Sequence, residues 1–259
     1  MNIFQSIILG IVQGLTEFLP VSSSGHLVII TKLLGLKPNI AFDVMLHFAT
    51  LLAVCVYFAP DIAQIIRSFI FHRSMKDPYF KLGLLIIVAS IPTAIIGFSF
   101  SDAFESMFSS ITYVSFFLIL TGILILTAES LGRSKKNIKK TGFIDSIIIG
   151  IAQGCAIAPG LSRSGTTVSA SLLMGLERNF AAKFSFLLSI PAILGASVFK
   201  SSAILTGINI ATISGFIFSA VSGYIAIMLF IRLIEKRNIR IFAYYCFLIA
   251  GISLLYFSR

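Results

Sequence analysis

Apolar runs of membrane-spanning length recur along this chain of 259 residues and constrain its fold more than any other feature. A helix needs about 20 mainly apolar residues to cross the hydrocarbon core of a bilayer. A buried core helix of a soluble protein would account for one such run, but not for six. We therefore predict an all-α integral membrane protein with spans at about 42–60, 82–100, 111–128, 184–199, 209–231 and 241–258.

The composition agrees with this class. Hydrophobic residues make up 57% of the chain and charged residues 12%, which is far from the usage of soluble globular domains. No basic segment precedes the first apolar run, so we expect no cleaved signal peptide. Cys55, Cys155 and Cys246 stand singly in apolar surroundings, which indicates packing residues rather than a metal or disulfide set.

The net charge of +10 follows a pattern that is typical of membrane proteins. Basic residues gather in alternate loops, as they do on the cytoplasmic side of a membrane. A nucleic-acid-binding face would need them on one soluble domain, so we expect no nucleic-acid partner. The rich loops hold Arg67, Arg73, Lys76, Lys81, Arg133, Lys135, Lys136, Lys139, Lys140, Arg178, Lys183, Arg232, Lys236, Arg237 and Arg240, and the others hold Lys32, Lys37, Lys200 and Arg259.

The alternation of basic loops predicts which side of the membrane each loop occupies. If the loops at 61–80 and 131–141 are cytoplasmic, the loop at 101–110 between them is outside. That loop holds Asp102 and Glu105 and no Lys or Arg, in agreement with this placement.

Two further apolar stretches are interrupted and must return to the side from which they enter. The stretch at 143–175 is flanked by basic residues on both sides and is broken at Pro159-Gly160. Counting spans backwards gives the same behaviour for 3–35, which is broken near Pro20. We therefore expect two re-entrant pairs of half-helices. The competing interpretation of the first stretch is two short full spans.

Each half of the chain then contains one re-entrant hairpin and three spans. Because three is odd, the second half is inverted relative to the first, and both termini lie outside. We expect a single membrane domain over 1–259, with repeats at about 1–130 and 142–259 joined by a basic cytoplasmic linker at about 131–141. Inverted repeats place their binding sites where broken helices meet.

The two breaks also share a sequence. Residues 10–25 (GIVQGLTEFLPVSSSG) and 150–165 (GIAQGCAIAPGLSRSG) agree at seven of 16 positions. Each copy carries polar residues that the other lacks, namely Glu17, Ser23 and His26 in the first and Arg163 and Thr166 in the second. Irregular backbone at membrane depth is tolerated only where it is buried or lines a wet cavity. The breaks are therefore the predicted site.

The half-helices that begin after the breaks favour an anion. Free N–H groups and the positive end of the helix dipole gather there, and Arg163 adds a forked cation suited to phosphate. The simpler interpretation is that the serines only cap the helices. For a phosphate or diphosphate we expect binding by Gln13, Ser22, Ser24, Gly160, Ser162, Ser164, Gly165 and Thr167.

Ionisable side chains near the breaks suggest chemistry. Gln13 and Glu17 lie one helical turn apart, so a carboxylate and an amide oxygen share one face. With phosphate oxygens they could hold a divalent cation, Mg²⁺ or Ca²⁺. Alternatively, Glu17 only pairs with Arg163 and locks the repeats together. His26, beside serine hydroxyls, is a candidate proton carrier. Asp145 is either a helix-start charge or a support for the site.

These residues resemble the motifs of a known family. QGLTEFLPVSSSGH at 13–26 resembles the (E/Q)xxxE and SSxGH signature of the BacA-type undecaprenyl-diphosphate phosphatases, and PGLSRSG at 159–165 resembles their PGxSRSG motif. The resemblance covers the whole chain. Gln13 stands where some members carry Glu, which leaves one carboxylate fewer for a metal.

The resemblance implies hydrolysis of the terminal phosphate of undecaprenyl diphosphate in the bacterial cytoplasmic membrane. We expect access from the outer face, because the hairpin that enters from the outside carries Glu17 and His26. The monophosphate product is the lipid carrier for peptidoglycan and other envelope polymers. On this basis the catalytic set is Glu17, Ser23, His26 and Arg163, with Glu17 and Gln13 as metal ligands. Ser23 is then the nucleophile and His26 its base or the acid for the leaving group. Direct attack by a metal-activated water is equally compatible with the sequence. The protein could also form a homodimer.

Rival functions fit the residues less well. Ser24-Gly25-His26 and Ser162-Arg163 imitate parts of the acid-phosphatase-like motifs, but the 15 residues after Arg163 contain neither the His nor the Asp that this class needs. A channel would not need these charges at two breaks. A secondary transporter or flippase of a phosphorylated polyprenyl lipid remains the alternative function.

Overall fold

The computed structural model describes residues 1–132, 135–199, 208–235 and 239–257, and it confirms the predicted helical class. Within these residues the chain forms helices and a single isolated β-bridge between Lys136 and Leu176. Five of the basic positions used to predict the topology lie outside the described residues: Arg133, Lys200, Lys236, Arg237 and Arg259.

Six helices in the described residues are long and apolar enough to cross a membrane, as predicted. Large apolar side chains such as Phe98, Val198 and Leu255 remain exposed on them, as a surface in contact with lipid requires. These helices are α3 (Ile40–Tyr57), α5 (Pro78–Ser99), α7 (Ile111–Leu131), α10 (Arg178–Phe199), α12 (Ile210–Glu235) and α13 (Arg240–Phe257). The protein is therefore a multi-pass membrane protein.

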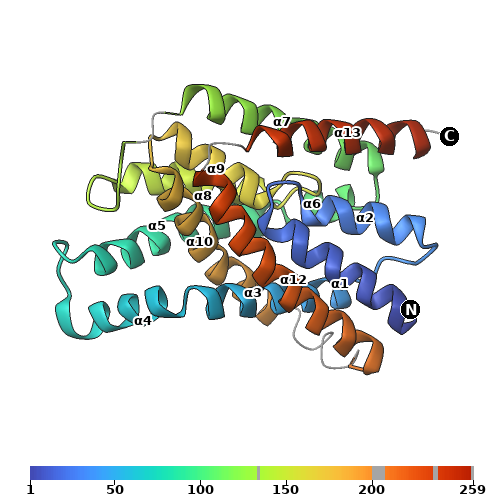
Figure 1. The fold of residues 1–259 in the computed structure, drawn as a ribbon, viewed down its shortest axis with the longest axis horizontal. Coiled ribbons are helices and arrows are strands. Elements are labelled where there is room, and N and C mark those ends of the chain that lie inside the picture. Colours follow the sequence, from blue (N-terminus) through green and yellow to red (C-terminus); the bar gives the residue numbers. More distant parts are fainter. Residues whose placement is uncertain (133–134, 200–207, 236–238, 258–259) are drawn as a thin grey trace.

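Four shorter helices form two hairpins whose breaks lie in the middle of the molecule (Figure 1). The hairpins are α1 (Ile3–Phe18) with α2 (Ser23–Leu33), and α8 (Phe143–Cys155) with α9 (Arg163–Leu173). Each first helix ends before a proline: α1 ends two residues before Pro20, and α8 ends four residues before Pro159. With 11 to 16 residues, these helices are shorter than a full span.

Two of the predicted loops contain helical structure. The segment expected to be a loop at 61–80 forms α4 (Ala59–Arg67) and a π-helical turn (Ser68–His72). Pro60 and Asp61 lie in the first turn of α4, where a fixed backbone angle and a negative charge both favour a helix start. The outer loop likewise contains α6 (Ser101–Met107).

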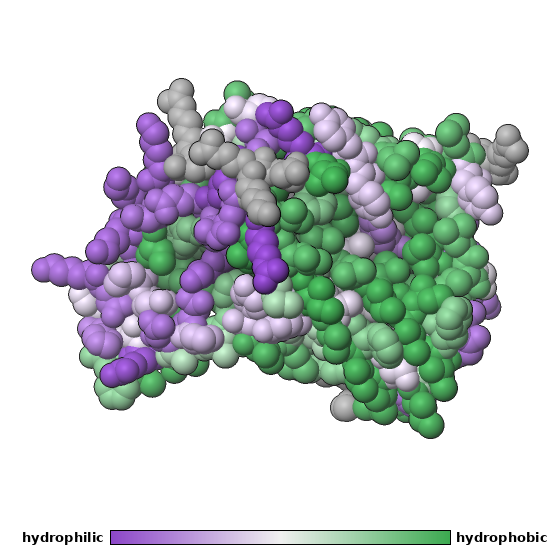
Figure 2. Space-filling view, in the orientation of Figure 1, coloured by the Kyte–Doolittle hydropathy of each residue, from purple (hydrophilic) through white to green (hydrophobic). Residues whose placement is uncertain are grey.

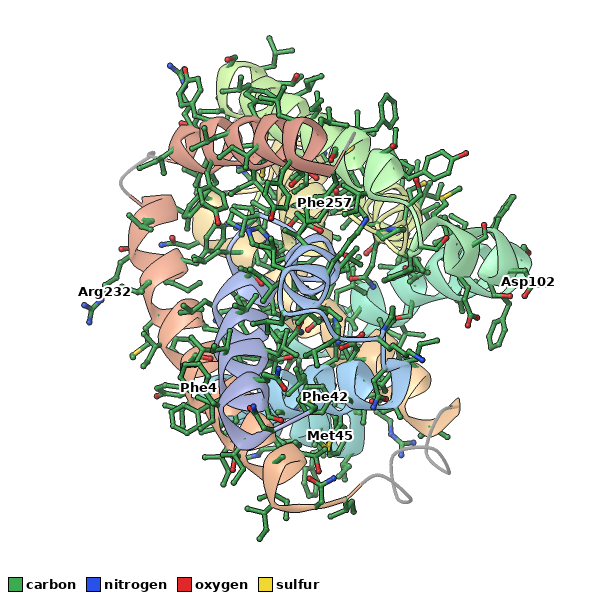
Figure 3. All side chains as sticks on the ribbon, turned by 90° about the vertical axis from the view of Figure 1, so that its right-hand side faces the viewer. Phe4, Phe42, Met45, Asp102, Arg232 and Phe257 are labelled. Carbon is green, nitrogen blue, oxygen red and sulfur yellow. The ribbon has the colours of Figure 1, made fainter. Side chains whose placement is uncertain are left out.

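Each hairpin packs against a long helix from the other half of the chain. Helix α1 packs along α12, and α8 packs along α5. Equivalent glycines allow this approach, because a Cβ atom at Gly10 would overlap the carbonyl oxygen of Gly215 and one at Gly150 would overlap that of Ala89. Seen from the end where the chain termini lie, α1 and α2 occupy the centre, while Asp102 and Arg232 project at the periphery (Figure 3). The halves are thus interlocked.

Hydrophilic residues gather at the end of the molecule opposite the termini (Figures 1 and 2). This end contains the loops between α4 and α5 and between α7 and α8. Ion pairs connect its helices: Lys183 to Asp61 (2.8 Å), Arg178 to Glu129 (3.0 Å) and Lys136 to Asp145 (2.8 Å). Asp145 also accepts the N–H of Gly142 at 2.9 Å, which supports its interpretation as a helix-start charge.

Substitution of Gly10 by Ala should destabilise the protein, because the added methyl group meets backbone that cannot move aside. Overpacking of this kind costs about 1–3 kcal/mol, so the thermal unfolding midpoint in detergent should fall. Gly251→Ala in α13 is the matched control, since nothing lies within 4 Å of a Cβ at that position. Equal midpoints for the two variants would contradict the proposed close packing.

Candidate active site

The two breaks contact each other directly. Ser24 accepts a hydrogen bond from the N–H of Gly160 at 3.4 Å, and Ser164 donates one to the carbonyl oxygen of Leu19 at 3.1 Å. Each hairpin therefore supplies hydrogen-bond partners to the irregular backbone of the other, as buried backbone groups require. Residues 136 and 145 positions apart in the sequence thus come into contact.

The two helices that begin at the breaks are capped in the same way. Ser22 accepts the N–H of Gly25 at 3.2 Å, and Ser162 accepts that of Gly165 at 3.1 Å. The capping interpretation is thus confirmed for these two serines. It does not exclude anion binding, because a capped helix keeps further N–H groups and a positive dipole end in its first turn.

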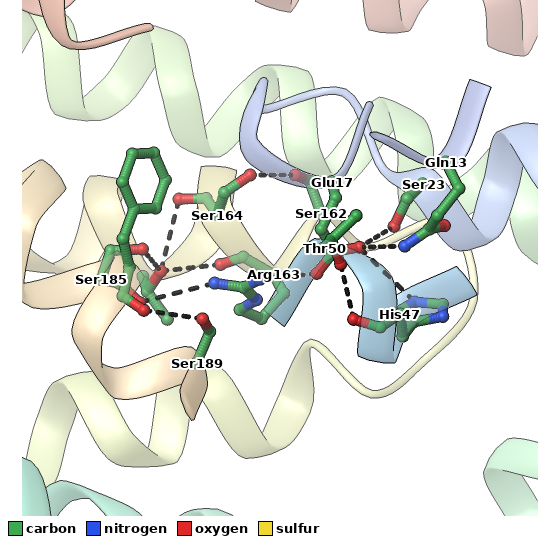
Figure 4. Close-up of polar contacts among 12 residues, drawn as sticks. Gln13, Glu17, Ser23, His47, Thr50, Ser162, Arg163, Ser164, Ser185 and Ser189 are labelled. Carbon is green, nitrogen blue, oxygen red and sulfur yellow. Dashed lines mark hydrogen bonds and ion pairs between the residues drawn. The ribbon is translucent and has the colours of Figure 1, made fainter. Parts of the chain in front are cut away.

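A buried carboxylate, Glu17, lies at the centre of the polar contacts (Figure 4). Its Oε1 atom accepts a hydrogen bond from Arg163 Nη2 at 2.6 Å. Its Oε2 atom accepts from Ser23 Oγ at 2.5 Å and from Gln13 Nε2 at 2.9 Å. The structure therefore brings together the carboxylate, the serine and the cation that the sequence analysis selected from opposite halves of the chain.

Arg163 is supported from behind by α10. Its Nη1 atom donates to the carbonyl oxygen of Ser185 at 3.4 Å. Thr167, a predicted binding residue, donates to the carbonyl oxygen of Arg163 at 2.8 Å and shares a 2.5 Å hydrogen bond with the Ser185 hydroxyl. In this arrangement Thr167 supports the first turn of α9. The sequence analysis did not identify Ser185.

A second unpredicted residue, His47 on α3, reaches the same carboxylate. Its Nε2 atom lies 3.4 Å from Glu17 Oε2, and its Nδ1 atom lies 2.8 Å from the carbonyl oxygen of Asp43. The signal for this residue was present in the sequence, since His47 and Asp43 are ionisable residues within a predicted span. Such residues are candidates for function by default.

His26 does not lie where the predicted proton transfer from Ser23 would need it. Its Nδ1 atom is 2.8 Å from the carbonyl oxygen of Ser22, and its Nε2 atom is 2.8 Å from Tyr245 Oη on α13. Ser23 donates to Glu17 instead. The reason is local, because Nδ1 closes onto the carbonyl four residues earlier and this turns Nε2 towards α13. Glu17 is thus the base that the geometry offers to Ser23.

Gln13 and Glu17 suit a divalent cation in one respect. The Oε1 atom of Gln13 is buried and accepts no hydrogen bond from the residues that the structure describes. A buried oxygen without a donor, one turn from a carboxylate, matches the preference of Mg²⁺ for oxygen ligands. The described part of the chain contains no group of three His, Cys, Asp or Glu placed for a metal, so phosphate oxygens and water would complete the coordination.

Comparison with known proteins identifies relatives across nearly the whole chain. Residues 6–252 match the family described as bacitracin resistance protein BacA. Proteins named undecaprenyl-diphosphatase from Methanobrevibacter smithii and Carboxydothermus hydrogenoformans are each 45% identical to this chain. The alignments cover 96% and 98% of this chain and 95% and 97% of those relatives, respectively. A protein of the same name from Halothermothrix orenii is also 45% identical, over 98% of both chains.

The ion pair between Glu17 and Arg163 should make a variant of either partner less stable than the double variant. Breaking a buried pair leaves an unpaired charge and costs about 3–5 kcal/mol. Thermal unfolding of Glu17→Gln, of Arg163→Met and of both together should show two large losses and a partial recovery, without recovery of activity. Lys183→Met removes a more exposed pair and should cost less than about 1 kcal/mol. Additive losses in the double variant would contradict this account.

Proposed function

Because this chain belongs to the BacA family of bacitracin resistance proteins, we propose that it is an undecaprenyl-diphosphatase. It removes the terminal phosphate of undecaprenyl diphosphate and leaves the monophosphate lipid. The observation that supports this proposal is the buried contact of Glu17 with Ser23 and Arg163, which would serve as base, nucleophile and phosphate-binding cation. The names of the relatives do not favour the transporter alternative.

The diphosphate group binds between the first turns of α2 and α9, while the polyprenyl chain remains in lipid. The binding residues are those of the two capped helix starts, Ser22, Ser24, Gly160, Ser162, Ser164 and Gly165, with Gln13 and Thr167 beside them. Arg163 stabilises the negative charge that develops on the transferring phosphoryl group. Its support by Ser185 holds the guanidinium in place before the substrate arrives.

Ser23 attacks the terminal phosphorus atom. As the Ser23 Oγ–P bond forms, Glu17 Oε2 accepts the hydroxyl proton, and the P–O bond to the bridging oxygen breaks, so that undecaprenyl phosphate leaves with the electron pair. Water then hydrolyses the phosphoserine and releases inorganic phosphate. Direct attack by water is the second route, and the 2.5 Å contact between Ser23 and Glu17 favours the serine.

Mg²⁺, or Ca²⁺ in its place, is the cofactor of this proposal. Glu17 and Gln13 would hold the ion together with oxygens of the substrate, and the ion would neutralise phosphate charge. Each Glu17 oxygen already accepts from a protein donor. Binding of a metal would therefore replace part of the contacts with Arg163, Ser23 or Gln13.

The architecture of the proposal is a pair of inverted repeats, at about 1–130 and 142–259, in the bacterial cytoplasmic membrane. Each repeat consists of a re-entrant hairpin and three spans, the site opens to the outer face, and both termini lie outside. The gathering of hydrophilic residues at the end opposite the termini, which contains the basic loops between α4 and α5 and between α7 and α8, supports this orientation. A cysteine introduced at Lys139 should react with an impermeant thiol reagent from the cytoplasmic side only, and one introduced at Asp102 should react from the outside only. The reverse labelling pattern would refute the proposed orientation.

Purified protein in detergent should release inorganic phosphate from a polyprenyl diphosphate. A chelator should abolish this release, and added Mg²⁺ or Ca²⁺ should restore it, because few protein ligands hold the ion. Colorimetric assay of phosphate measures both effects. Absence of release from polyprenyl diphosphates with either metal would remove the enzymatic proposal, whereas release that a chelator leaves unchanged would remove the metal alone.

Ser23→Ala should lower kcat by at least about 100-fold, since both the nucleophile and its contact with Glu17 are lost. Acid quenching of wild-type protein with a ³²P-labelled substrate should trap a phosphoserine at Ser23. Ser101→Ala on exposed α6 is the control and should leave turnover unchanged. Near-normal turnover of Ser23→Ala would transfer the attack to water.

A further inference from the structure

We propose that Tyr245 is a positioning residue for the nucleophile. Acting through His26, Tyr245 holds the peptide of Ser22 and thereby the direction of the Ser23 side chain. This inference rests on the proposed function, because it takes Ser23 as the attacking group. It assigns a part in the site to α13, the C-terminal helix of the described chain.

The two hydrogen bonds of the His26 ring determine which atom donates and which accepts in each. The carbonyl oxygen of Ser22 can only accept, so the Nδ1 atom of His26, 2.8 Å away, carries a proton. In the neutral ring Nε2 is then an acceptor, and the Tyr245 hydroxyl, at 2.8 Å, donates to it. The two rings are nearly parallel, with 4° between their planes and 5.6 Å between their centroids. The chain of donors thus runs from Tyr245 through His26 to Ser22.

The last residue in this series of hydrogen bonds, Ser22, has a strained backbone. Ser22 has φ 68° and ψ 97°, and Arg73 is the only other described residue besides glycine with positive φ. A side chain disfavours such a backbone, which persists only where surrounding contacts hold it. For Ser22 these contacts are its capping bond to Gly25, the contact of its hydroxyl with that of Ser24, and the bonds of its carbonyl oxygen to both the backbone N–H and the ring Nδ1 of His26.

The second hairpin shows that a break of this kind does not require the strain. Its capping residue, Ser162, makes the same bond to the N–H of Gly165 but has an ordinary extended backbone, with φ −66° and ψ 118°. The residue equivalent to His26 is Thr166, whose hydroxyl is buried without a partner among the described residues. The strained peptide and the His26–Tyr245 pair therefore occur together, in the hairpin that carries the nucleophile.

The strained peptide directly precedes the nucleophile. Ser23 is the first residue of α2, and its hydroxyl lies 2.5 Å from Glu17. Relaxation of Ser22 to an extended backbone would rotate the peptide that leads into Ser23 and lengthen this contact. Tyr245 thus affects turnover more than substrate binding, because the residues that bind phosphate lie mainly on other segments.

Tyr245→Phe removes only the hydroxyl and keeps the ring. We expect kcat to fall roughly tenfold, as for the loss of one partly buried hydrogen bond of ordinary strength, with KM changed by less than about twofold. Tyr244→Phe is the matched control, since the adjacent side chain is 62% exposed. This control should leave kcat and KM unchanged.

Two further measurements separate positioning from general destabilisation. His26→Ala should lower kcat at least as much as Tyr245→Phe, and the double variant should be no worse than His26→Ala, because Tyr245 acts through His26. His26→Asn keeps a donor near Nδ1, so it should retain more turnover than His26→Ala. The ¹⁵N NMR signals of His26 should show the Nδ1–H tautomer in the wild type and a mixture of tautomers in Tyr245→Phe.

Three results would overturn this inference while leaving the phosphatase function in place. They are an unchanged kcat in Tyr245→Phe, a change in KM without a change in kcat, and effects on kcat that multiply in the double variant. An identical His26 tautomer in wild type and Tyr245→Phe would overturn it independently of activity. Failure of the wild type to release phosphate would refute the proposed function, and the positioning of a nucleophile with it.

Discussion

The site depends on one buried contact, the ion pair between Glu17 and Arg163. The two charges come from opposite halves of the chain and lie 2.6 Å apart with little exposure to solvent. Either charge alone would be unfavourable in this buried position, because removal of an ion from water costs several kcal/mol. The attraction between the two charges must offset this desolvation cost. The pair therefore requires both breaks to meet, and it brings the proposed base and the proposed phosphate-binding cation to the meeting point.

The packing of the hairpins explains how two helix breaks can exist within an apolar protein. Each hairpin packs along a long helix of the other half, α1 on α12 and α8 on α5, and the polar groups at the breaks bond across to each other. Small residues on the hairpins permit this close approach. As a result, the irregular backbone is shielded from lipid, and it faces the partner break where substrate is proposed to bind.

The chemistry arises from differences between two similar breaks. Both are capped by serine in the same way, but Glu17 stands opposite Ile157 in the sequence repeat, and Ser23 opposite Arg163. The strained backbone of Ser22 has no counterpart at Ser162. One half therefore supplies the proposed base and nucleophile, and the other supplies the proposed phosphate-binding cation.

Much of the architecture could be predicted from the sequence, because membrane spans, proline breaks and serine caps are local patterns of a few to 20 residues. The resemblance to family motifs identified Glu17, Ser23 and Arg163, and the structure places all three together. The sequence could not predict which hydrogen-bond or ion-pair partner each of these side chains has in the folded protein.

The sequence by itself determined the membrane class, the spans, the two breaks and the residues concentrated at them. Only the tertiary structure decided that Ser23 donates to Glu17 and that His26 is engaged by Tyr245, 219 residues away. It also brought His47 from α3 to within 3.4 Å of Glu17. The physical reason is that hydropathy and capping act along the chain, whereas hydrogen-bond partners depend on how separate helices pack and which faces they turn towards each other.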